Sequence, residues 1–358
     1  MTRPTLTLNT LQAKKNIQKM KAICEQHEMD FRPHFKTHQS PQIAEWFRQE
    51  GIDKCTCSSL DMAYEFVNHG WKDICVAIPL NVREMQKANL IASQVKLSLC
   101  VDHLETLTRL AQETYSPIFV FIEIDTGYGR SGVYYEDRTL INSLLKKIDV
   151  TEHLEFSGFL SHTGNSYHSL NAKKGRSIFE EARKNMEELK KEYMEQYPQM
   201  ILSMGDTPSS NFADKFDGID EWRPGNFIFY DFMQYAIGAC AEEEIAVRVK
   251  CPVIGIYLKR TEIAIYGGGV HLSKDSIQYQ KETIYGWAHY ENESIANGFP
   301  VISLSQEHGI IRVSEAFLKR VKIGDILDII PIHSCMTADL NAYYLTEDSR
   351  QISKFRTY

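Results

Sequence analysis

Two short segments of the chain combine residue types that could do chemistry, and the first surrounds Lys36. In the run Arg32-Pro33-His34-Phe35-Lys36-Thr37-His38, this lysine stands between two histidines and behind a proline. Because Pro33 fixes its own φ and favours extended geometry in the residue before it, the run is typical of a strand end. A lysine that points from a strand end into a barrel mouth can lose its proton and attack a carbonyl carbon. An ordinary solvated lysine in a basic loop is the alternative, and the pattern alone favours it.

The second segment is Pro331-Ile332-His333-Ser334-Cys335, near the other end of the chain. Residues two apart share a face on a strand but point about 200° apart on a helix. The isoleucine-rich run before Pro331 predicts a strand that leads into a loop. An imidazole and a thiolate presented together suit zinc, and only two protein ligands would leave positions for water or substrate. A buried cysteine beside a structural histidine is the commoner explanation of a single His-x-Cys pair.

Taken together, the two segments resemble those of the D-serine dehydratase and D-threonine aldolase family. These are pyridoxal 5'-phosphate (PLP) enzymes with the alanine-racemase type of fold. The resemblance continues through glycine-containing motifs in the family's order, which are individually weak. These motifs are residues 125–133 (DTGYGRSGV), 161–167 (SHTGNSY), 205–208 (GDTP), 223–227 (RPGNF) and 306–309 (QEHG).

The resemblance implies roles for residues around the cofactor ring. Lys36 matches the lysine that binds PLP as a Schiff base, and its freed amine would remove the α-proton of the substrate. Arg130 and Tyr167 are both candidates to contact the pyridine nitrogen, and the resemblance favours Tyr167. A neutral tyrosine or an arginine there would leave that nitrogen largely unprotonated, so that the ring is a weaker electron sink. A metal that helps to expel the leaving group would offset this weakness.

A phosphate group is best bound by backbone N–H groups that no side chain obstructs, and glycine-rich turns supply them. Two such turns match the loops on the phosphate side of the family's cofactor. They make candidate phosphate ligands of Gly205, Thr207, Gly225 and Asn226. Without the resemblance, two ordinary tight turns would be the better explanation.

The resemblance also implies that His333 and Cys335 bind a metal ion. The second ligand is typically an aspartate in the aldolase branch of the family and a cysteine in its dehydratase branch. A thiolate favours zinc, whereas a carboxylate favours magnesium or manganese. Three further histidines, His34, His162 and His308, are candidates to contact the substrate or the ligating groups, and a structural role is the alternative for His308.

The implied function is a PLP- and zinc-dependent lyase that converts D-serine, or a related β-hydroxy-D-amino acid, into a 2-keto acid and ammonia. A metal-dependent D-threonine aldolase is the alternative, and the cysteine of the His-x-Cys pair counts against it. An amino-acid racemase would need a second base, and a PLP-binding protein without turnover would lack a β domain. The exact substrate stays open because Gln39, Asn165 and Asp339 depart from the family's usual residues.

Composition limits the class of protein. A chain of 358 residues, with 43% hydrophobic and 24% charged residues, fits a globular protein made of a large barrel and a smaller domain. A net charge of −7 without a long basic run argues against nucleic acid or an anionic membrane surface as the partner. Eight cysteines without regular spacing, and no signal-peptide core, predict a cytoplasmic protein with reduced thiols. Only the resemblance implies a homodimer.

The pattern of apolar residues predicts which elements position these groups. Strand-like and helix-like segments alternate over residues 10–238, including a continuous apolar run at 118–124 and an amphipathic helix at 173–197, which predicts a (β/α)8 barrel. Residues 239–358 read as short strands joined by glycine-containing turns, which predicts a smaller antiparallel β domain that carries the metal ligands. Residues 1–9 could add a strand to that domain. Active sites of such barrels lie at the carboxyl ends of the strands, where Lys36, Arg130 and His162 are expected.

Overall fold

The computed structural model of the protein describes residues 1–169, 171–291 and 293–355, and they form two compact units. The barrel unit consists of Gln18–Lys36 and Ala44–Gly225. The β unit consists of Met1–Ile17, Thr37–Ile43 and the described residues from Asn226 onward. The chain therefore passes from one unit to the other between Lys36 and Thr37.

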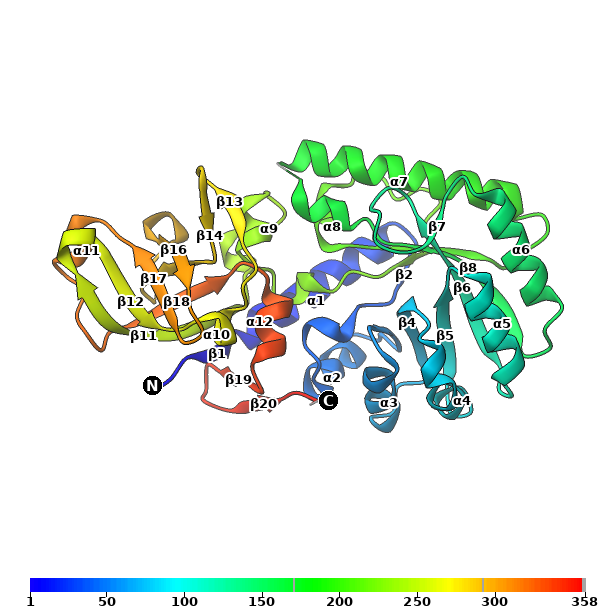
Figure 1. Cartoon of the computed structure of the whole chain (residues 1–358), viewed down its shortest axis with the longest axis horizontal. Coiled ribbons are helices and arrows are strands. Elements are labelled where there is room, and N and C mark those ends of the chain that lie inside the picture. Colours follow the sequence, from blue (N-terminus) through cyan, green and yellow to red (C-terminus); the bar gives the residue numbers. More distant parts are fainter. Residues whose placement is uncertain (170, 292, 356–358) are drawn as a thin grey trace. The chain divides into compact units, whose positions relative to one another are not determined.

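The barrel unit is built on eight parallel strands, ordered β2-β10-β9-β8-β6-β5-β4-β3 (Figure 1). Their bounds are β2 (Asp30–Phe31), β3 (Lys54–Cys57), β4 (Asp73–Pro79), β5 (Lys96–Val101), β6 (Ile118–Asp125), β8 (Leu154–Ser161), β9 (Ile201–Met204) and β10 (Glu221–Trp222). A bridge between His34 and Thr56 joins the two ends of this order, and the Thr56 N–H donates to the Pro33 carbonyl oxygen at 2.9 Å. The strands thus form a nearly closed ring, and the predicted (β/α)8 barrel is confirmed.

Helices follow the strands along the chain, as the alternating pattern predicted. They are α1 (Thr10–Gln26), α2 (Pro41–Gln49), α3 (Leu60–Asn68), α4 (Met85–Ala92), α5 (Leu104–Glu113), α6 (Arg138–Asp149), α7 (Ala172–Tyr193) and α8 (Thr207–Phe212). In α7, Phe179, Ala182, Met186 and Leu189 are buried at spacings of three and four residues, which is one face of a helix. The short strand β7 (Val133–Tyr134) pairs with the end of β6.

The barrel interior is polar as well as apolar. Arg32 is buried, and its guanidinium donates to the carboxylates of Glu221 and Asp73, each at 2.6 Å. An ion pair of this kind contributes little net stability, but removal of one partner leaves a buried charge without compensation. The paired charges therefore tie the segment after β2 to its neighbour β10 and to β4, from which β2 is separated by β3 alone.

The β unit is mainly antiparallel. Its strand order is β12-β17-β16-β15-β18-β11-β1-β19-β20, and because β11 also pairs with β12, six of these strands close into a ring. Their bounds are β1 (Thr5–Leu8), β11 (Val247–Tyr257), β12 (Glu262–Tyr266), β15 (Gly286–His289), β16 (Phe299–Leu304), β17 (His308–Arg312), β18 (Ile326–Pro331), β19 (Tyr343–Thr346) and β20 (Gln351–Ser353). The strands β13 (Ile277–Tyr279) and β14 (Glu282–Ile284) form a separate hairpin. The predicted fold class, a barrel with an antiparallel β domain, is confirmed.

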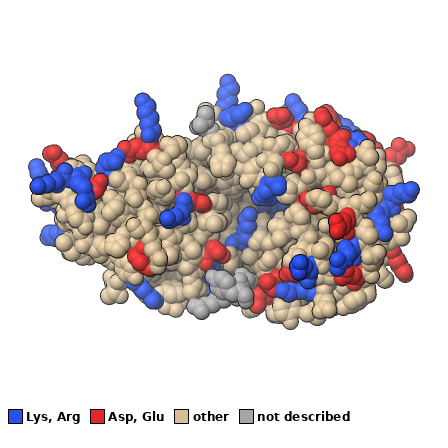
Figure 2. Space-filling view, viewed as in Figure 1, with Lys and Arg blue, Asp and Glu red and all other residues tan. Residues whose placement is uncertain are grey.

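Helices of the β unit are short. They are α9 (Phe232–Ala236), α10 (Gly269–Leu272), α11 (Glu315–Leu318) and α12 (Ser334–Leu340). Across the described residues no helix of the chain is both long enough and apolar enough to cross a membrane. On the face of the molecule that Figure 2 shows, Lys and Arg side chains are interspersed with Asp and Glu.

One local prediction was wrong. The segment after β18 does not continue as a loop, because α12 begins at Ser334 and includes Cys335. His333 is the residue before the helix and has extended backbone angles, with φ −131° and ψ 106°. The angular argument against a His-x-Cys pair on a helix therefore does not apply, since only the cysteine belongs to the helix.

Candidate active site

The predicted cofactor residues of the barrel unit follow the ends of different strands. Lys36 lies in the 3-10 helix Phe35–Thr37, shortly after β2, and Tyr167 lies in the 3-10 helix Gly164–His168, shortly after β8. The other residues of the set come from the segments after β6, β8, β9 and β10, namely Arg130, His162, Gly205, Thr207 and Gly225. Because parallel strands end at the same rim of a barrel, all of these residues belong to its carboxyl rim. We call this set of residues the barrel group.

Positive groups surround two half-buried histidines, His34 and His162, in this barrel group. Burial, with the charges of Lys36 and Arg130, lowers the pKa of His162 to about 3. Burial likewise holds the pKa of His34 well below its ordinary value, and the charge of Lys36 adds to the effect. Both imidazoles are therefore neutral at physiological pH, in a field that would stabilise an anion. The backbone N–H of Lys36 lies 3.4 Å from the His34 Nδ1 atom.

The turn from Gly205 to Thr207 is held by a buried carboxylate. Asp206 caps α8, accepting the backbone N–H of Ser209 at 2.9 Å, the Ser166 hydroxyl at 2.7 Å and the hydroxyl of Thr163. A Cβ atom on Gly205 would lie 2.4 Å from the backbone nitrogen of Arg223, so close packing against the neighbouring strand end requires glycine here. The turn is thus rigid, as a phosphate-binding loop must be.

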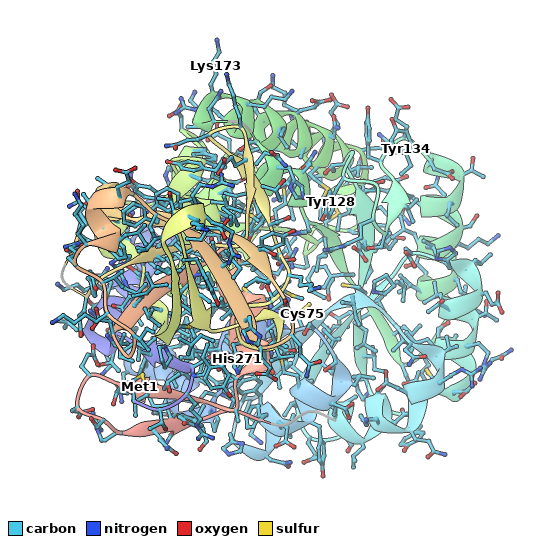
Figure 3. All side chains as sticks on the ribbon, turned by 60° about the vertical axis from the view of Figure 1, so that its left-hand side comes forward. Met1, Cys75, Tyr128, Tyr134, Lys173 and His271 are labelled. Carbon is cyan, nitrogen blue, oxygen red and sulfur yellow. The ribbon has the colours of Figure 1, made fainter. Side chains whose placement is uncertain are left out.

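Aromatic rings connect the remaining members of the barrel group. The Arg130 guanidinium lies 5.3 Å from the ring centre of Tyr128, which follows β6 and is labelled in Figure 3. The Tyr128 ring lies 5.9 Å from that of His162, which in turn lies 6.4 Å from that of Tyr167. The Tyr167 hydroxyl oxygen is 3.4 Å from the backbone nitrogen of Thr207. These contacts place Tyr167 beside the Gly205–Thr207 turn.

Arg223 is a member of this group that the sequence reasoning missed. Its buried guanidinium donates to the Ser203 hydroxyl at 2.7 Å and to the Ser161 carbonyl oxygen at 2.9 Å, at the ends of β9 and β8. It also contributes to the low pKa of His34 and of His162. The signal that could have found it is an arginine directly after a short strand, as Arg32 is after β2.

The predicted metal ligands, His333 and Cys335, lie in the β unit. We call them, with the side chains that contact them, the metal group. The Cys335 sulfur lies 3.2 Å from the Thr37 hydroxyl oxygen and 3.7 Å from the Asn226 amide nitrogen. Burial alone would lower the pKa of His333, but the charge of Cys335 and a hydrogen bond to it, with Asp231, raise it to about 9. The pair therefore has the electrostatics of a cation site.

Carboxylates surround this pair and fix its backbone. Asp231 accepts the Ser334 backbone N–H at 2.9 Å and the Asn226 amide at 2.6 Å. The Asp275 carboxylate lies 3.5 Å from the His333 Nδ1 atom. Sequence reasoning did not single out Thr37, Asp231 or Asp275 as members of the site, because they are distant in the chain from the His-x-Cys motif.

The donor set fits a catalytic zinc ion. Imidazole and thiolate are zinc ligands, and a site with few protein ligands leaves coordination positions for water or substrate. In the described parts of the chain, no three or more His, Cys, Asp and Glu side chains form a ready metal cage. His333 and Cys335 would thus be the two protein ligands of an open site.

Two predicted site residues lie elsewhere than expected from their motifs. Asn226 belongs to the β unit, where its amide donates to Asp231 and to the Ser334 hydroxyl at 2.8 Å. His308 begins β17 and is exposed, paired with Tyr266 of β12. Within the described residues, no hydrogen bond or ion pair joins His308 to His333 or Cys335.

The fold and the two groups define an enzyme of the alanine-racemase-like class. The family model of the alanine racemase N-terminal domain matches residues 8–231, which is more than half of the chain, and the chain therefore belongs to this family. A second model, described as a serine dehydratase domain, matches residues 246–346. The predicted resemblance and the predicted class, a PLP-dependent lyase, are confirmed.

Similarity to known dehydratases extends over nearly the whole chain. The D-serine dehydratase of Dictyostelium discoideum is 28% identical over 366 residues, covering 92% of this chain and 89% of that protein. The D-threo-3-hydroxyaspartate dehydratase of Delftia sp. (strain HT23) is 28% identical over 356 residues, covering 95% and 93%. A solved structure of the latter enzyme, a cysteine-to-alanine mutant in its metal-free form, matches with a TM-score of 0.93. It is 26% identical and covers 100% of this chain and 98% of that chain.

Proposed function

We propose that the protein is a PLP- and zinc-dependent dehydratase that converts D-serine, or a related β-hydroxy-D-amino acid, into a 2-keto acid and ammonia. The main support for this proposal is the His333–Cys335 pair. The Cys335 thiol also contacts Thr37, the residue that directly follows Lys36 in the chain. The similarity to two dehydratases of β-hydroxy-amino acids supports the reaction type. The cysteine favours the dehydratase over the aldolase alternative.

The barrel group would bind the cofactor. When bound, PLP supplies an electron sink for the negative charge that develops at the substrate Cα atom. Lys36 would hold the cofactor and then take the α-proton with its amine. The backbone N–H groups of the Gly205–Thr207 turn, with that of Gly225, would bind the phosphate.

Arg130 and Arg223, with Lys36, would supply the positive field that an anionic cofactor requires, since after burial their charges lower the pKa of His162. Tyr167 is the candidate for the pyridine nitrogen that the family resemblance favours. Its hydroxyl also lies beside the backbone nitrogen of Thr207, so that it would border the phosphate-binding turn.

The metal group would activate the leaving group. When bound, zinc acts as a Lewis acid on the β-hydroxyl of the substrate and makes hydroxide a tolerable leaving group. The His333 imidazole and the Cys335 thiolate would hold the ion, and the Thr37 hydroxyl would orient the thiolate through its 3.2 Å contact. Asp231 would fix the first turn of α12 through the Ser334 N–H, and Asp275 would orient the imidazole.

The proposal includes a cytoplasmic homodimer. None of the eight cysteines forms a disulfide in the described residues, which is usual in a reducing compartment. The homodimer is supported by the family resemblance. Analytical ultracentrifugation of the PLP-loaded protein would test it, and a monomer at micromolar concentration would contradict it.

The decisive experiment measures product release by the PLP-loaded protein. D-Serine is supplied with and without EDTA, and D-threonine is run alongside with assays for keto acid and acetaldehyde. We expect pyruvate from D-serine, its loss on chelation and its return when zinc is added. Acetaldehyde from D-threonine, without pyruvate from D-serine, would instead establish the aldolase. Pyruvate release that chelation does not change would refute the role of the metal.

A further inference from the structure

The β unit contains a polar cavity that shares no lining residue with the two groups described above. Its volume is about 570 Å3, and its lining comes from strands β1, β11, β15, β18 and β19 and from the segments beside them. These strands are neighbours in the order β15-β18-β11-β1-β19, so the cavity floor is one continuous sheet face. Cavities of about 300–1,000 Å3 are the usual size of small-molecule sites.

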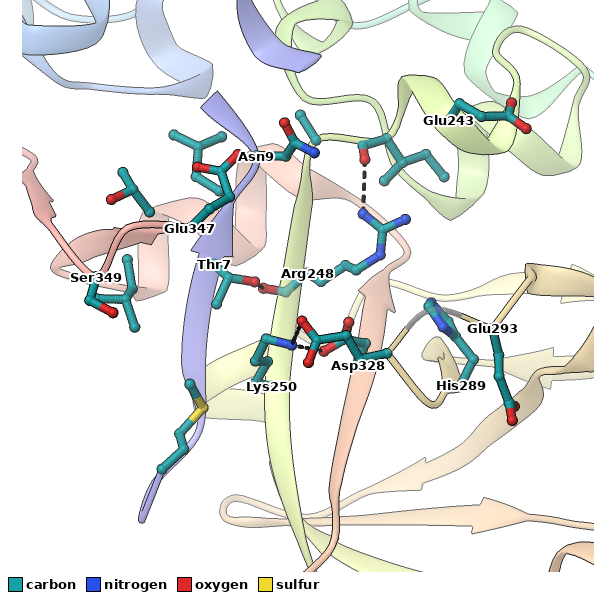
Figure 4. Close-up of a pocket in the computed structure, with 17 residues that line it drawn as sticks. Thr7, Asn9, Glu243, Arg248, Lys250, His289, Glu293, Asp328, Glu347 and Ser349 are labelled. Carbon is teal, nitrogen blue, oxygen red and sulfur yellow. Dashed lines mark hydrogen bonds and ion pairs between the residues drawn. The ribbon is translucent and has the colours of Figure 1, made fainter. Parts of the chain in front are cut away.

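The polar residues of this floor are aligned by the sheet register. Lys250 on β11 is opposite Asp328 on β18, and Asp328 is opposite His289 on β15. Arg248 lies two residues before Lys250 and therefore on the same face of β11. The alternate residues of β11, such as Val249, are buried in the core. Figure 4 shows Arg248, Lys250 and Asp328 between His289 and Glu347, which lie on opposite sides.

The two cations on the floor differ in their partners. The Lys250 ammonium is neutralised by Asp328 at 2.9 Å and by Glu291 at 3.1 Å. The Arg248 guanidinium donates to the Ile245 carbonyl oxygen at 2.9 Å, and no carboxylate of the described residues forms an ion pair with it. Burial lowers its pKa. The charges of Asp328 and Glu242 act on it without an ion pair, so the guanidinium keeps donors that can bind a carboxylate ligand.

One ring nitrogen of His289, the histidine on the cavity floor, has no hydrogen-bond donor beside it in the described residues. His289 is 3% exposed, and its Nδ1 atom lies 2.8 Å from the Tyr290 carbonyl oxygen, so that Nδ1 carries the proton. Its Nε2 atom is then an acceptor, and it is buried without a hydrogen-bond partner in the described residues. A buried polar atom in this state costs free energy that a ligand N–H or O–H group would recover.

The remaining charges of the lining are negative. They are Glu243, Glu291, Glu293, Asp328 and Glu347. In Figure 4, Glu293 lies beside His289 and Asp328 beside Lys250, with which Glu291 also pairs. Four of these five carboxylates have partners, since Asp328 and Glu291 pair with Lys250, Glu293 pairs with Arg320, and Glu347 accepts the Thr10 backbone N–H. An acidic wall disfavours a phosphate or a dicarboxylate and favours a ligand that also bears a positive group.

We propose that this cavity binds a small α-amino acid as a zwitterion. The ligand carboxylate accepts hydrogen bonds from Arg248, and the ligand ammonium donates to the His289 Nε2 atom among the surrounding carboxylates. In an enzyme that consumes an amino acid, this would be a second amino-acid site, and its binding chemistry does not depend on Lys36 or on the metal ligands.

The test is calorimetric titration of holoenzyme pretreated with borohydride, which fixes the cofactor to its lysine and prevents reaction with amines. The probes are glycine, acetate and methylammonium. We expect glycine to bind at least tenfold more tightly than either half-probe. Arg248→Gln should weaken both glycine and acetate at least tenfold. His289→Phe should weaken glycine but leave acetate unchanged.

Arg260→Gln is the matched control, because Arg260 is an exposed arginine of the β unit that pairs with Glu262 and does not line the cavity. This variant should bind glycine as the unmodified chain does. Equal glycine affinity in Arg248→Gln and Arg260→Gln would overturn the proposal, as would the absence of glycine binding to the unmodified chain. The two cavity variants remove different binding groups, a cation and an acceptor, so the proposal stays testable if one of them fails to fold.

Discussion

The barrel group and the metal group each contain a half-buried histidine, yet the pKa values of the two histidines move in opposite directions. In the barrel unit, burial and the charges of Lys36 and Arg130 bring the pKa of His162 to about 3. In the β unit, burial also opposes protonation, but the charge of Cys335 and its carboxylate neighbours raise the pKa of His333 to about 9. Burial acts in the same direction in both places, so the sign of the neighbouring charges decides the outcome.

This difference indicates what each group is built to bind. A rim crowded with lysine and arginine pays an electrostatic cost that an anionic ligand relieves, and PLP carries a phosphate. A thiolate beside carboxylates carries the opposite excess, which a divalent cation relieves. A histidine thus lies in a positive electrostatic field in the barrel group and in a negative field in the metal group. The positive field suits the anionic cofactor of the proposed reaction, and the negative field suits its metal ion.

The largest effect is expected when Lys36, the lysine of the barrel group, is removed. Lys36→Ala should lower the rate of keto-acid release from D-serine by about 10⁴-fold, because no other group would both hold the cofactor and take the α-proton. The absorbance of lysine-bound cofactor should vanish as well. Lys54→Ala is the control, since Lys54 pairs with Asp30 at 2.6 Å on the same barrel. A Lys36→Ala variant with a tenth of the original rate would contradict the assignment.

The next largest effect is expected when the thiolate of Cys335 in the metal group is removed. Cys335→Ala should lower turnover by about 100-fold, or roughly 2.7 kcal/mol, because a Lewis-acid metal would no longer assist the leaving group. Elemental analysis should show loss of zinc, while the absorbance of lysine-bound cofactor is unchanged. Cys240→Ala is the control because Cys240 is a half-buried thiol of the same unit. Full zinc content in Cys335→Ala would show that the thiolate is no ligand.

The sequence predicted the elements of both groups better than their electrostatics. The apolar run at 118–124 became β6, and the amphipathic helix at 173–197 became α7 with an earlier end. These elements were predictable because their periodicity is local. The short α12 was not predicted, because it has only seven residues and directly follows a proline-interrupted strand.

The direction of each pKa shift could not be predicted from the sequence because it depends on contacts between distant residues. His333 responds to Asp231 and Asp275, and His162 responds to Lys36 and Arg223. Neither set is close in the chain, and no spacing rule joins its members. Arg223 was within a recognised motif but unassigned, since only the fold shows that its guanidinium is held by Ser203 and Ser161.

A third test uses the dependence of stability on pH. The pKa of His162 is lowered to about 3 in the folded state, against 6.5 for an ordinary histidine. Between these values the unfolded chain binds a proton that the folded chain excludes, so the free energy of unfolding falls as the pH falls below 6.5. The slope for one such group is at most about 1.4 kcal/mol per pH unit, or about 2 kcal/mol between pH 6.5 and 5.

Denaturant unfolding at pH 7 and at pH 5 would measure this contribution. The His162→Gln variant should lose about 2 kcal/mol less than the unmodified chain over that interval, because it lacks the excluded proton. His69→Gln is the control, since His69 is exposed on the barrel unit. An identical acid loss in His162→Gln and in the unmodified chain would mean that this histidine is not held neutral by the fold.

The smallest expected effect separates burial from charge in the barrel group. Arg130→Gln removes one of the cations that lower the pKa of His162, so this pKa should rise from about 3 by a shift of roughly one unit or less. Imidazole resonances followed by NMR over an acid titration would measure the shift. Arg138→Gln is the control because Arg138 pairs with Glu192 on α7. A pKa that stays at about 3 in Arg130→Gln would assign the shift to burial, and the case for an anion-binding field at the barrel rim would then depend on Lys36 and Arg223.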